Sequence, residues 1–226
     1  MLLTFVESAV FAILSLLQAP IRGTVVATFP TFVSFQLTKQ LLSIGFGLVP
    51  VWLVLYLARR PGEGGLPGLG LKTDRFGRDV GWGAILAVVV GAVGLGLYLV
   101  AVQMGANRLV VPVPPLNHWW TIPVLVLGSI QNGLLEEVIV VGYFMTRLQR
   151  LGSAGWVAVV ASAVLRGSYH LYQGWGGFLG NLAMGLFFGW VFLRWRRTWP
   201  LVVAHALIDI GAGVLFIAAC PLKPYC

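Results

Sequence analysis

The chain has 226 residues, of which 58% are hydrophobic and only 10% charged, with a net charge of +8. Soluble domains carry about 25% charged residues, so this composition excludes a soluble globular protein and predicts a polytopic membrane protein. The positive charge does not indicate nucleic-acid binding, because the bases form short clusters between apolar runs. We therefore expect the lipid bilayer, and no nucleic acid, as a partner.

Seven apolar runs of about 18 or more residues predict membrane helices. In chain order they are residues 2–19, 36–58, 80–104, 119–148, 154–172, 176–194 and 199–220. The stretch 24–35 is apolar enough to add a short or interfacial element. The predicted fold class is therefore an all-α, polytopic transmembrane helix bundle with seven membrane helices, or eight if this stretch is counted.

Three parts are expected along the chain. Residues 1–118 supply three spans and a basic loop at 59–79, residues 119–220 hold nearly all of the polar side chains within apolar runs, and residues 221–226 form a short tail. We expect the function to be concentrated in the second part.

Loop charges predict the orientation in the cell membrane. The connections at 59–79, 147–150 and 194–197 carry ten bases, whereas the opposite side of the predicted bundle carries four. Basic loops tend to remain in the cytoplasm. The N-terminus is therefore predicted to be cytoplasmic and the C-terminus to lie outside.

The most informative feature is the adjacent pair Glu136 and Glu137 within an apolar run. A charged side chain at bilayer depth costs about 2.5–3.5 kcal/mol on insertion scales, so the pair must face polar surroundings. Such a pair is a functional-site hypothesis by default. The three following runs carry further polar side chains, namely Arg166, His170, Asn181, His205 and Asp209.

Spacing sorts these side chains onto helix faces. Arg166 and His170 are four residues apart, as are His205 and Asp209, and residues at this spacing share one face. We expect all of them to converge with Glu136 on one interior site. A carboxylate and an imidazole can together deprotonate water; alternatively, Glu136, His170, His205 and Asp209 can bind a divalent metal such as zinc. Both chemistries, metal-dependent and metal-free, are compatible with these residues.

The site can form only if its residues lie at similar depths in the membrane. At a rise of 1.5 Å per residue, Glu136 lies about 18 Å from the cytoplasmic end of its run, His205 about 9 Å and His170 about 24 Å. Parallel helices would then separate these side chains. We expect the fifth helix to start deeper than residue 154, which would bring His170 closer.

At these residues the chain resembles a known family. Glu136-Glu137-x-x-x-x-Gly142-Tyr143, His170, and His205-x-x-x-Asp209 are similar to the motifs of the CAAX-protease and bacteriocin-processing (CPBP, or Abi) family of intramembrane endopeptidases, whose eukaryotic member is the Ras-converting endopeptidase. The resemblance covers roughly residues 119–213. It implies a catalytic helix bundle that cleaves a peptide bond in a membrane-associated or lipid-modified substrate.

The resemblance also implies roles. Glu136 would activate the attacking water with help from His170, while His205 and Asp209 would stabilise the tetrahedral intermediate or complete a metalloprotease-like metal site. The arginine of the family pattern is replaced by Val141, and Arg166 stands where the pattern has an aromatic residue. We predict that Arg166 supplies, across the helix interface, the cation that Glu137 needs.

Two further side chains are candidates for supporting roles. Tyr143 is a candidate site-lining hydroxyl. Asn181 either reaches the site or belongs to a packing face in which Gly177, Gly185 and Gly189 recur every four residues.

Other classes of function fit the same residues. A proton- or solute-coupled transporter would use the buried carboxylates as relay groups, although no inverted repeat of the kind common in transporters is evident. A non-catalytic membrane scaffold would keep the polar core only to define its helix packing. In the simplest structural alternatives, Glu136 and Glu137 are only a buried pair satisfied by Arg166 and Gln131, and His205 and Asp209 only bind each other.

Overall fold

The computed structural model describes residues 2–18, 25–27, 36–112 and 118–219. Helices dominate the described chain, which confirms the all-α class. Two three-residue strands, β1 (Val25–Ala27) and β2 (Leu109–Val111), pair in parallel with Val25 opposite Leu109. The eighth element expected at 24–35 lies outside the described residues except for β1.

The helices differ in number and length from the predicted runs. The first part contains α1 (Leu2–Gln18), α2 (Gln36–Gly47), α3 (Val49–Ala58), α4 (Gly65–Gly68) and α5 (Phe76–Gln103). The second part contains α6 (Thr121–Leu134), the π-helix η1 (Leu135–Tyr143), α7 (Phe144–Arg150), α8 (Gly155–Tyr169), the 3₁₀ turn η2 (Leu171–Gln173), α9 (Trp175–Trp195) and α10 (Trp199–Ala219).

Five helical stretches in the described chain are long and apolar enough to cross a membrane: Leu37–Ala58, Phe76–Gln103, Thr121–Arg150, Trp175–Trp195 and Trp199–Ala219. This agrees with a multi-pass membrane protein. Helices α1 and α8, with 17 and 15 residues, are shorter than the roughly 20 residues that a full crossing needs. The predicted count of seven or eight spans is therefore not confirmed.

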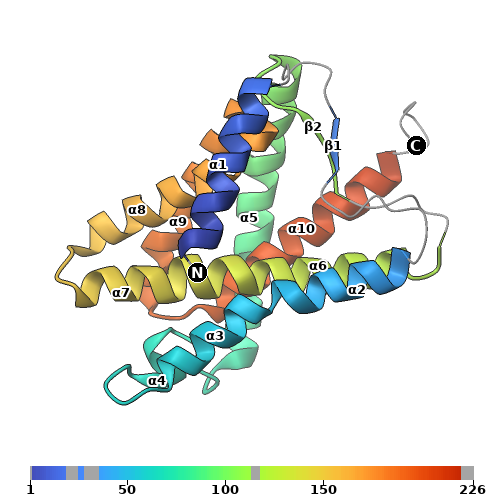
Figure 1. The fold of residues 1–226 in the computed structure, drawn as a ribbon. Coiled ribbons are helices and arrows are strands. Elements are labelled where there is room, and N and C mark those ends of the chain that lie inside the picture. The colour runs from blue at the N-terminus through green and yellow to red at the C-terminus, as the bar shows by residue number, and fades with distance from the viewer. Residues whose placement is uncertain (1, 19–24, 28–35, 113–117, 220–226) are drawn as a thin grey trace.

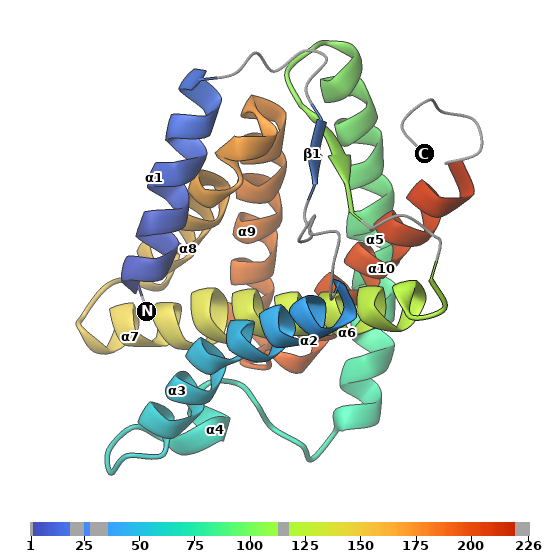
Figure 2. The same ribbon diagram turned by 45° about the vertical axis from the view of Figure 1, so that its right-hand side comes forward.

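Helices α6, η1 and α7 form one continuous helix that runs across the direction of α5 in both views (Figures 1 and 2). Helix α8 packs on α9, and α10 packs on both α5 and α6. Every residue from Glu136 to Gly142 is buried, because apolar clusters lie on both sides of η1. The carboxylate pair is thus at the centre of the bundle.

Glycines allow the helices to approach closely. A Cβ atom on Gly133 of α6 would lie 2.9 Å from the Val202 carbonyl oxygen in α10, and one on Gly185 of α9 would lie 2.8 Å from the Ala163 Cα in α8. Small residues permit such close backbone contact between membrane helices. The packing face predicted on α9 is confirmed at Gly185.

The three basic connections predicted to share one side lie together. Arg150 donates to Glu63 Oε2 at 2.5 Å, and Arg196 donates to Gln149 Oε1 at 2.8 Å. Arg197 donates to the buried Asp79 at 2.7 Å. Which face of the membrane this side occupies remains a prediction from loop charge.

Candidate active site

The two glutamates lie at the start of a π-helix of nine residues. Its i→i+5 hydrogen bonding widens the turn, and such segments occur frequently at functional sites. Successive side chains are therefore rotated by a smaller angle than in an α-helix. Glu136 and Glu137 can consequently both face α8, where Arg166 lies between them.

Arg166 connects the two carboxylates. Its Nε donates to Glu136 Oε2 at 3.0 Å, and its Nη2 donates to Glu137 Oε1. The Arg166 side chain is only 1% exposed. The predicted pair between Arg166 and Glu137 is confirmed, and the arginine also binds Glu136. Removing one partner of such a buried pair costs about 3–5 kcal/mol, because a charge is left without compensation.

The two oxygens of Glu136 have different surroundings. Oε2 accepts from Arg166 Nε and, at 2.7 Å, from the Tyr169 hydroxyl. Oε1 lies 4.0 Å from His170 Nε2, too far for a direct hydrogen bond. The His170 Nδ1 lies 3.0 Å from the Arg166 carbonyl oxygen. Because a carbonyl can only accept, Nδ1 carries a hydrogen, and in the neutral form of the ring Nε2 is then an acceptor that faces Glu136.

His205, on α10, joins the polar cluster formed by Glu136, Glu137, Arg166, Tyr169 and His170. Its Nδ1 lies 2.7 Å from Glu137 Oε1, and its Nε2 lies 3.3 Å from Asn132 Nδ2 and 3.7 Å from Asp209 Oδ2. Asn132 Nδ2 also donates to Asp209 Oδ2 at 2.9 Å. The Asn132 amide therefore lies against Nε2 of the imidazole, and Asp209 is linked to the same edge through Asn132.

The structure brings together six of the eight side chains selected from the sequence, namely Glu136, Glu137, Arg166, His170, His205 and Asp209. Asn181 donates instead to the Gly177 carbonyl within its own helix α9 at 3.0 Å, so this bond reaches neither the site nor a neighbouring helix. Tyr143 lies with its ring centroid 5.3 Å from Arg147 Cζ and lines a separate pocket.

Tyr169 was not among the side chains selected from the sequence, although its hydroxyl binds Glu136. The available signal was its position three residues after Arg166, since this spacing places two residues on the same helix side.

The expected late start of the fifth helix is not what brings His170 to the site. Helix α8 begins at Gly155, one residue from the predicted boundary. The helix that carries Glu136 instead crosses its neighbours, so depth along one helix does not measure depth along another.

These side chains do not fit a divalent metal ion. Among the residues that the structure describes, no group of three or more His, Cys, Asp or Glu side chains is arranged to hold one. The Arg166 guanidinium binds both glutamates, and Glu137 Oε1 also contacts His205. A cation that belongs to the protein thus already pairs with both carboxylates, and no step proposed below depends on a metal.

Comparison with known proteins addresses the same part of the chain. No curated protein and no solved structure matches the sequence. Residues 118–211 match the family described as "Type II CAAX prenyl endopeptidase Rce1-like". The matched segment runs from the entry of α6 into α10 and contains every side chain of the polar cluster. The resemblance expected from the sequence is confirmed: residues 118–211 are similar to Rce1-like type II CAAX prenyl endopeptidases.

Proposed function

We propose that the protein is an intramembrane endopeptidase in which Glu136 and His170 activate a water molecule for attack on a peptide bond. The main support is the 4.0 Å separation of Glu136 Oε1 and His170 Nε2. A single water can bind two acceptors at this separation, and a polar gap of this length is typical of water-mediated contacts. The family match independently favours an endopeptidase with a membrane-associated protein substrate.

In the proposed reaction, the water transfers a proton to Glu136 Oε1 while its oxygen bonds to the carbonyl carbon of the substrate. The carbonyl π electrons move to oxygen and form a tetrahedral oxyanion. When this intermediate collapses, the C–N bond breaks and the leaving amine takes the proton from Glu136. A positioned general base contributes about 10²–10⁴ in rate.

The remaining side chains would prepare this chemistry. Tyr169 and Arg166 hold Glu136 Oε2, which leaves Oε1 directed toward His170. A protonated His205 would stabilise the oxyanion, since donors positioned before the reaction act most strongly where charge develops. Asp209 would orient Asn132, and Glu137 would orient His205 through the contact at Nδ1.

The experiment compares wild-type protein with Glu136→Gln, both reconstituted in lipid vesicles with a membrane-protein extract and a prenylated CAAX-type peptide as probes. New peptide termini are identified by mass spectrometry. Wild type is expected to generate them, and Glu136→Gln to do so at least about 100-fold more slowly, because the general base is lost. Asp74→Asn is the matched control, since Asp74 is exposed and pairs with Arg197 outside the cluster. Equal cleavage by wild type and Glu136→Gln would refute the proposal.

A chelator added to the same assay addresses cofactor use. A metal-free reaction predicts that cleavage continues unchanged after chelation. Loss of cleavage that returns with zinc would instead support a metal site and contradict the proposed role of Glu136 as a base acting without metal. A transporter would show neither result, and no observation in the structure or the family match favours that alternative.

A further inference from the structure

A cavity separate from the polar cluster lies where the start of α1 meets η1, α7 and α8. It has a volume of about 390 Å³. Its apolar lining includes Phe5, Ile139, Val140, Phe144 and Leu165. Arg147 and Arg150 line it too, and they lie at the far end of α7, roughly 15 Å along the helix from Ile139. The cavity is therefore apolar at one end, and at the other end the two arginines lie beside Leu151.

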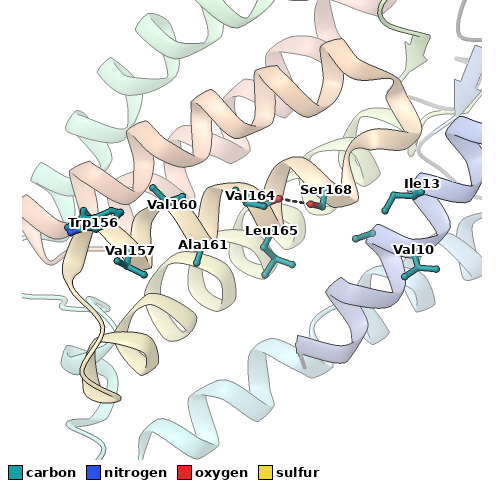
Figure 3. Close-up of a pocket in the computed structure, with 10 residues that line it drawn as sticks. Val10, Ile13, Trp156, Val157, Val160, Ala161, Val164, Leu165 and Ser168 are labelled. Carbon is teal, nitrogen blue, oxygen red and sulfur yellow. Dashed lines mark hydrogen bonds between the residues drawn. The ribbon is translucent and has the colours of Figure 1, made fainter.

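The apolar end continues along α8. Leu165 also lines a groove of about 690 Å³ between α8 and α1. Figure 3 shows Val157, Ala161 and Leu165 along α8 and Val10 on the neighbouring α1. The one hydroxyl of this lining, Ser168, donates to the Val164 carbonyl at 2.7 Å and so presents no free donor to the groove. A long hydrocarbon chain can thus follow one apolar path from the cavity into the groove.

The basic end has an excess of positive charge. Arg147 and Arg150 both pair with one carboxylate, that of Glu63, at 2.8 and 2.5 Å. The two arginine side chains are 35% and 34% exposed. Arg150 also donates to the backbone carbonyl oxygens of Gly62 and Glu63. Each guanidinium has five N–H donors, so the two side chains have more donors than the Glu63 carboxylate and these two carbonyls accept. Partly exposed ion pairs are also weak, so an incoming phosphate can share or replace Glu63.

We propose that this cavity binds a membrane glycerophospholipid with an anionic head group. The phosphate would contact Arg147 and Arg150, and one acyl chain would lie against Val140 and Leu165 and extend toward α1. Basic pockets between membrane helices are a recognised mode of binding for anionic lipid head groups. Charge complementarity at one end and apolar continuity at the other both favour this occupant. This site is independent of the proposed peptidase chemistry.

Native mass spectrometry of the full-length, detergent-purified protein tests the proposal. The protein is titrated with phosphatidylglycerol, with phosphatidylcholine of the same chains, and with glycerol 3-phosphate as a head group without chains. Phosphatidylglycerol is expected to bind at least about tenfold more tightly than phosphatidylcholine, and glycerol 3-phosphate is not expected to compete. Equal binding of the two lipids would overturn the proposal, and full competition by glycerol 3-phosphate would show a simple anion site instead.

Charge variants locate the site. Arg147→Gln combined with Arg150→Gln should weaken phosphatidylglycerol binding by about tenfold or more, since each base near an anionic lipid contributes about fivefold. The matched control is Arg59→Gln combined with Arg60→Gln, which removes the same charge from exposed residues outside the cavity. An equal loss in the control pair would show that general basicity attracts the lipid and would refute the assigned site.

Two further variants test the proposal even if the Arg147→Gln, Arg150→Gln double variant does not fold. Glu63→Gln removes the competing carboxylate and should tighten phosphatidylglycerol binding several-fold, whereas an unchanged or weaker affinity would contradict the proposal. Leu165→Trp narrows the apolar path and should weaken the binding of phosphatidylglycerol. Thermal melting in phosphatidylcholine confirms that each variant is folded before its affinity is interpreted.

Discussion

Two groups of arginine and glutamate side chains lie along the helix formed by α6, η1 and α7, and they differ mainly in burial. Arg166 and the two glutamates of η1 have side chains that are 0–5% exposed. Arg147 and Arg150 are about one-third exposed and share Glu63. The same pair of functional groups is thus enclosed between helices in one place and is partly open to the surroundings in the other.

Burial decides what each group can do. In the enclosed cluster, a charge without its partner would cost about 3–5 kcal/mol, so the side chains keep one arrangement that suits a positioned base. Exposed pairs contribute only about 0–1 kcal/mol, so Glu63 can exchange with a ligand. An ion pair in this protein therefore supports the structure where it is buried, and offers a binding surface where it is partly exposed.

Removal of the buried cation is expected to have the largest effect on stability. Arg166→Ala is expected to lower the free energy of unfolding by about 3–5 kcal/mol, because Glu136 and Glu137 lose their shared partner. Adding Glu137→Gln should restore part of that loss by removing one uncompensated charge. Denaturation in detergent measures both effects, with the exposed Arg194→Ala as control. A melting temperature unchanged by Arg166→Ala would contradict the assignment.

A smaller effect is expected where a neutral group supports the cluster. Tyr169→Phe should lower kcat about tenfold, equivalent to about 1.4 kcal/mol, because Glu136 Oε2 loses one donor and its carboxylate is held less firmly. The Michaelis constant should change little, since Tyr169 would act through Glu136. Tyr98→Phe provides a matched control on α5, where the hydroxyl accepts from Val110 N at 3.0 Å. Equal loss of kcat in both variants would indicate a general structural role.

The smallest effect is expected at the exposed group. Glu63→Gln should change the free energy of unfolding by less than about 1 kcal/mol, because water already surrounds part of the ion pairs that it breaks. The same denaturation experiment measures it beside Arg166→Ala. If the two variants were equally destabilised, burial would not be the property that separates the two groups.

Part of the candidate site was predictable because a charged side chain removed from water needs a polar or charged partner. Glu136 and Glu137 inside an apolar run required a cation, and Arg166 was the base nearest in sequence within another predicted span. The spacing of His205 and Asp209 also indicated one shared helix face. Their convergence followed from the high cost of placing such groups in lipid.

Other features were not predictable from spacing. The π-helix changes the direction of both glutamates, and Tyr143 turns toward Arg147 instead of the cluster. Run length also predicted more spans than the five described stretches that are long enough to cross a membrane, and the apolar helix α8 is short where it packs on α9.

By itself, the sequence determined the class of protein, the order of the polar helices and the need for the buried charges to meet, because composition and desolvation act without reference to a particular fold. Only the tertiary structure decided that His170 reaches Glu136, that Tyr169 holds one carboxylate oxygen, and that Arg147 and Arg150 border an apolar cavity. The physical reason is that helix crossing and helix type set directions in space. Spacing along a chain records position on one helix only, and carries no information on how that helix lies against the next.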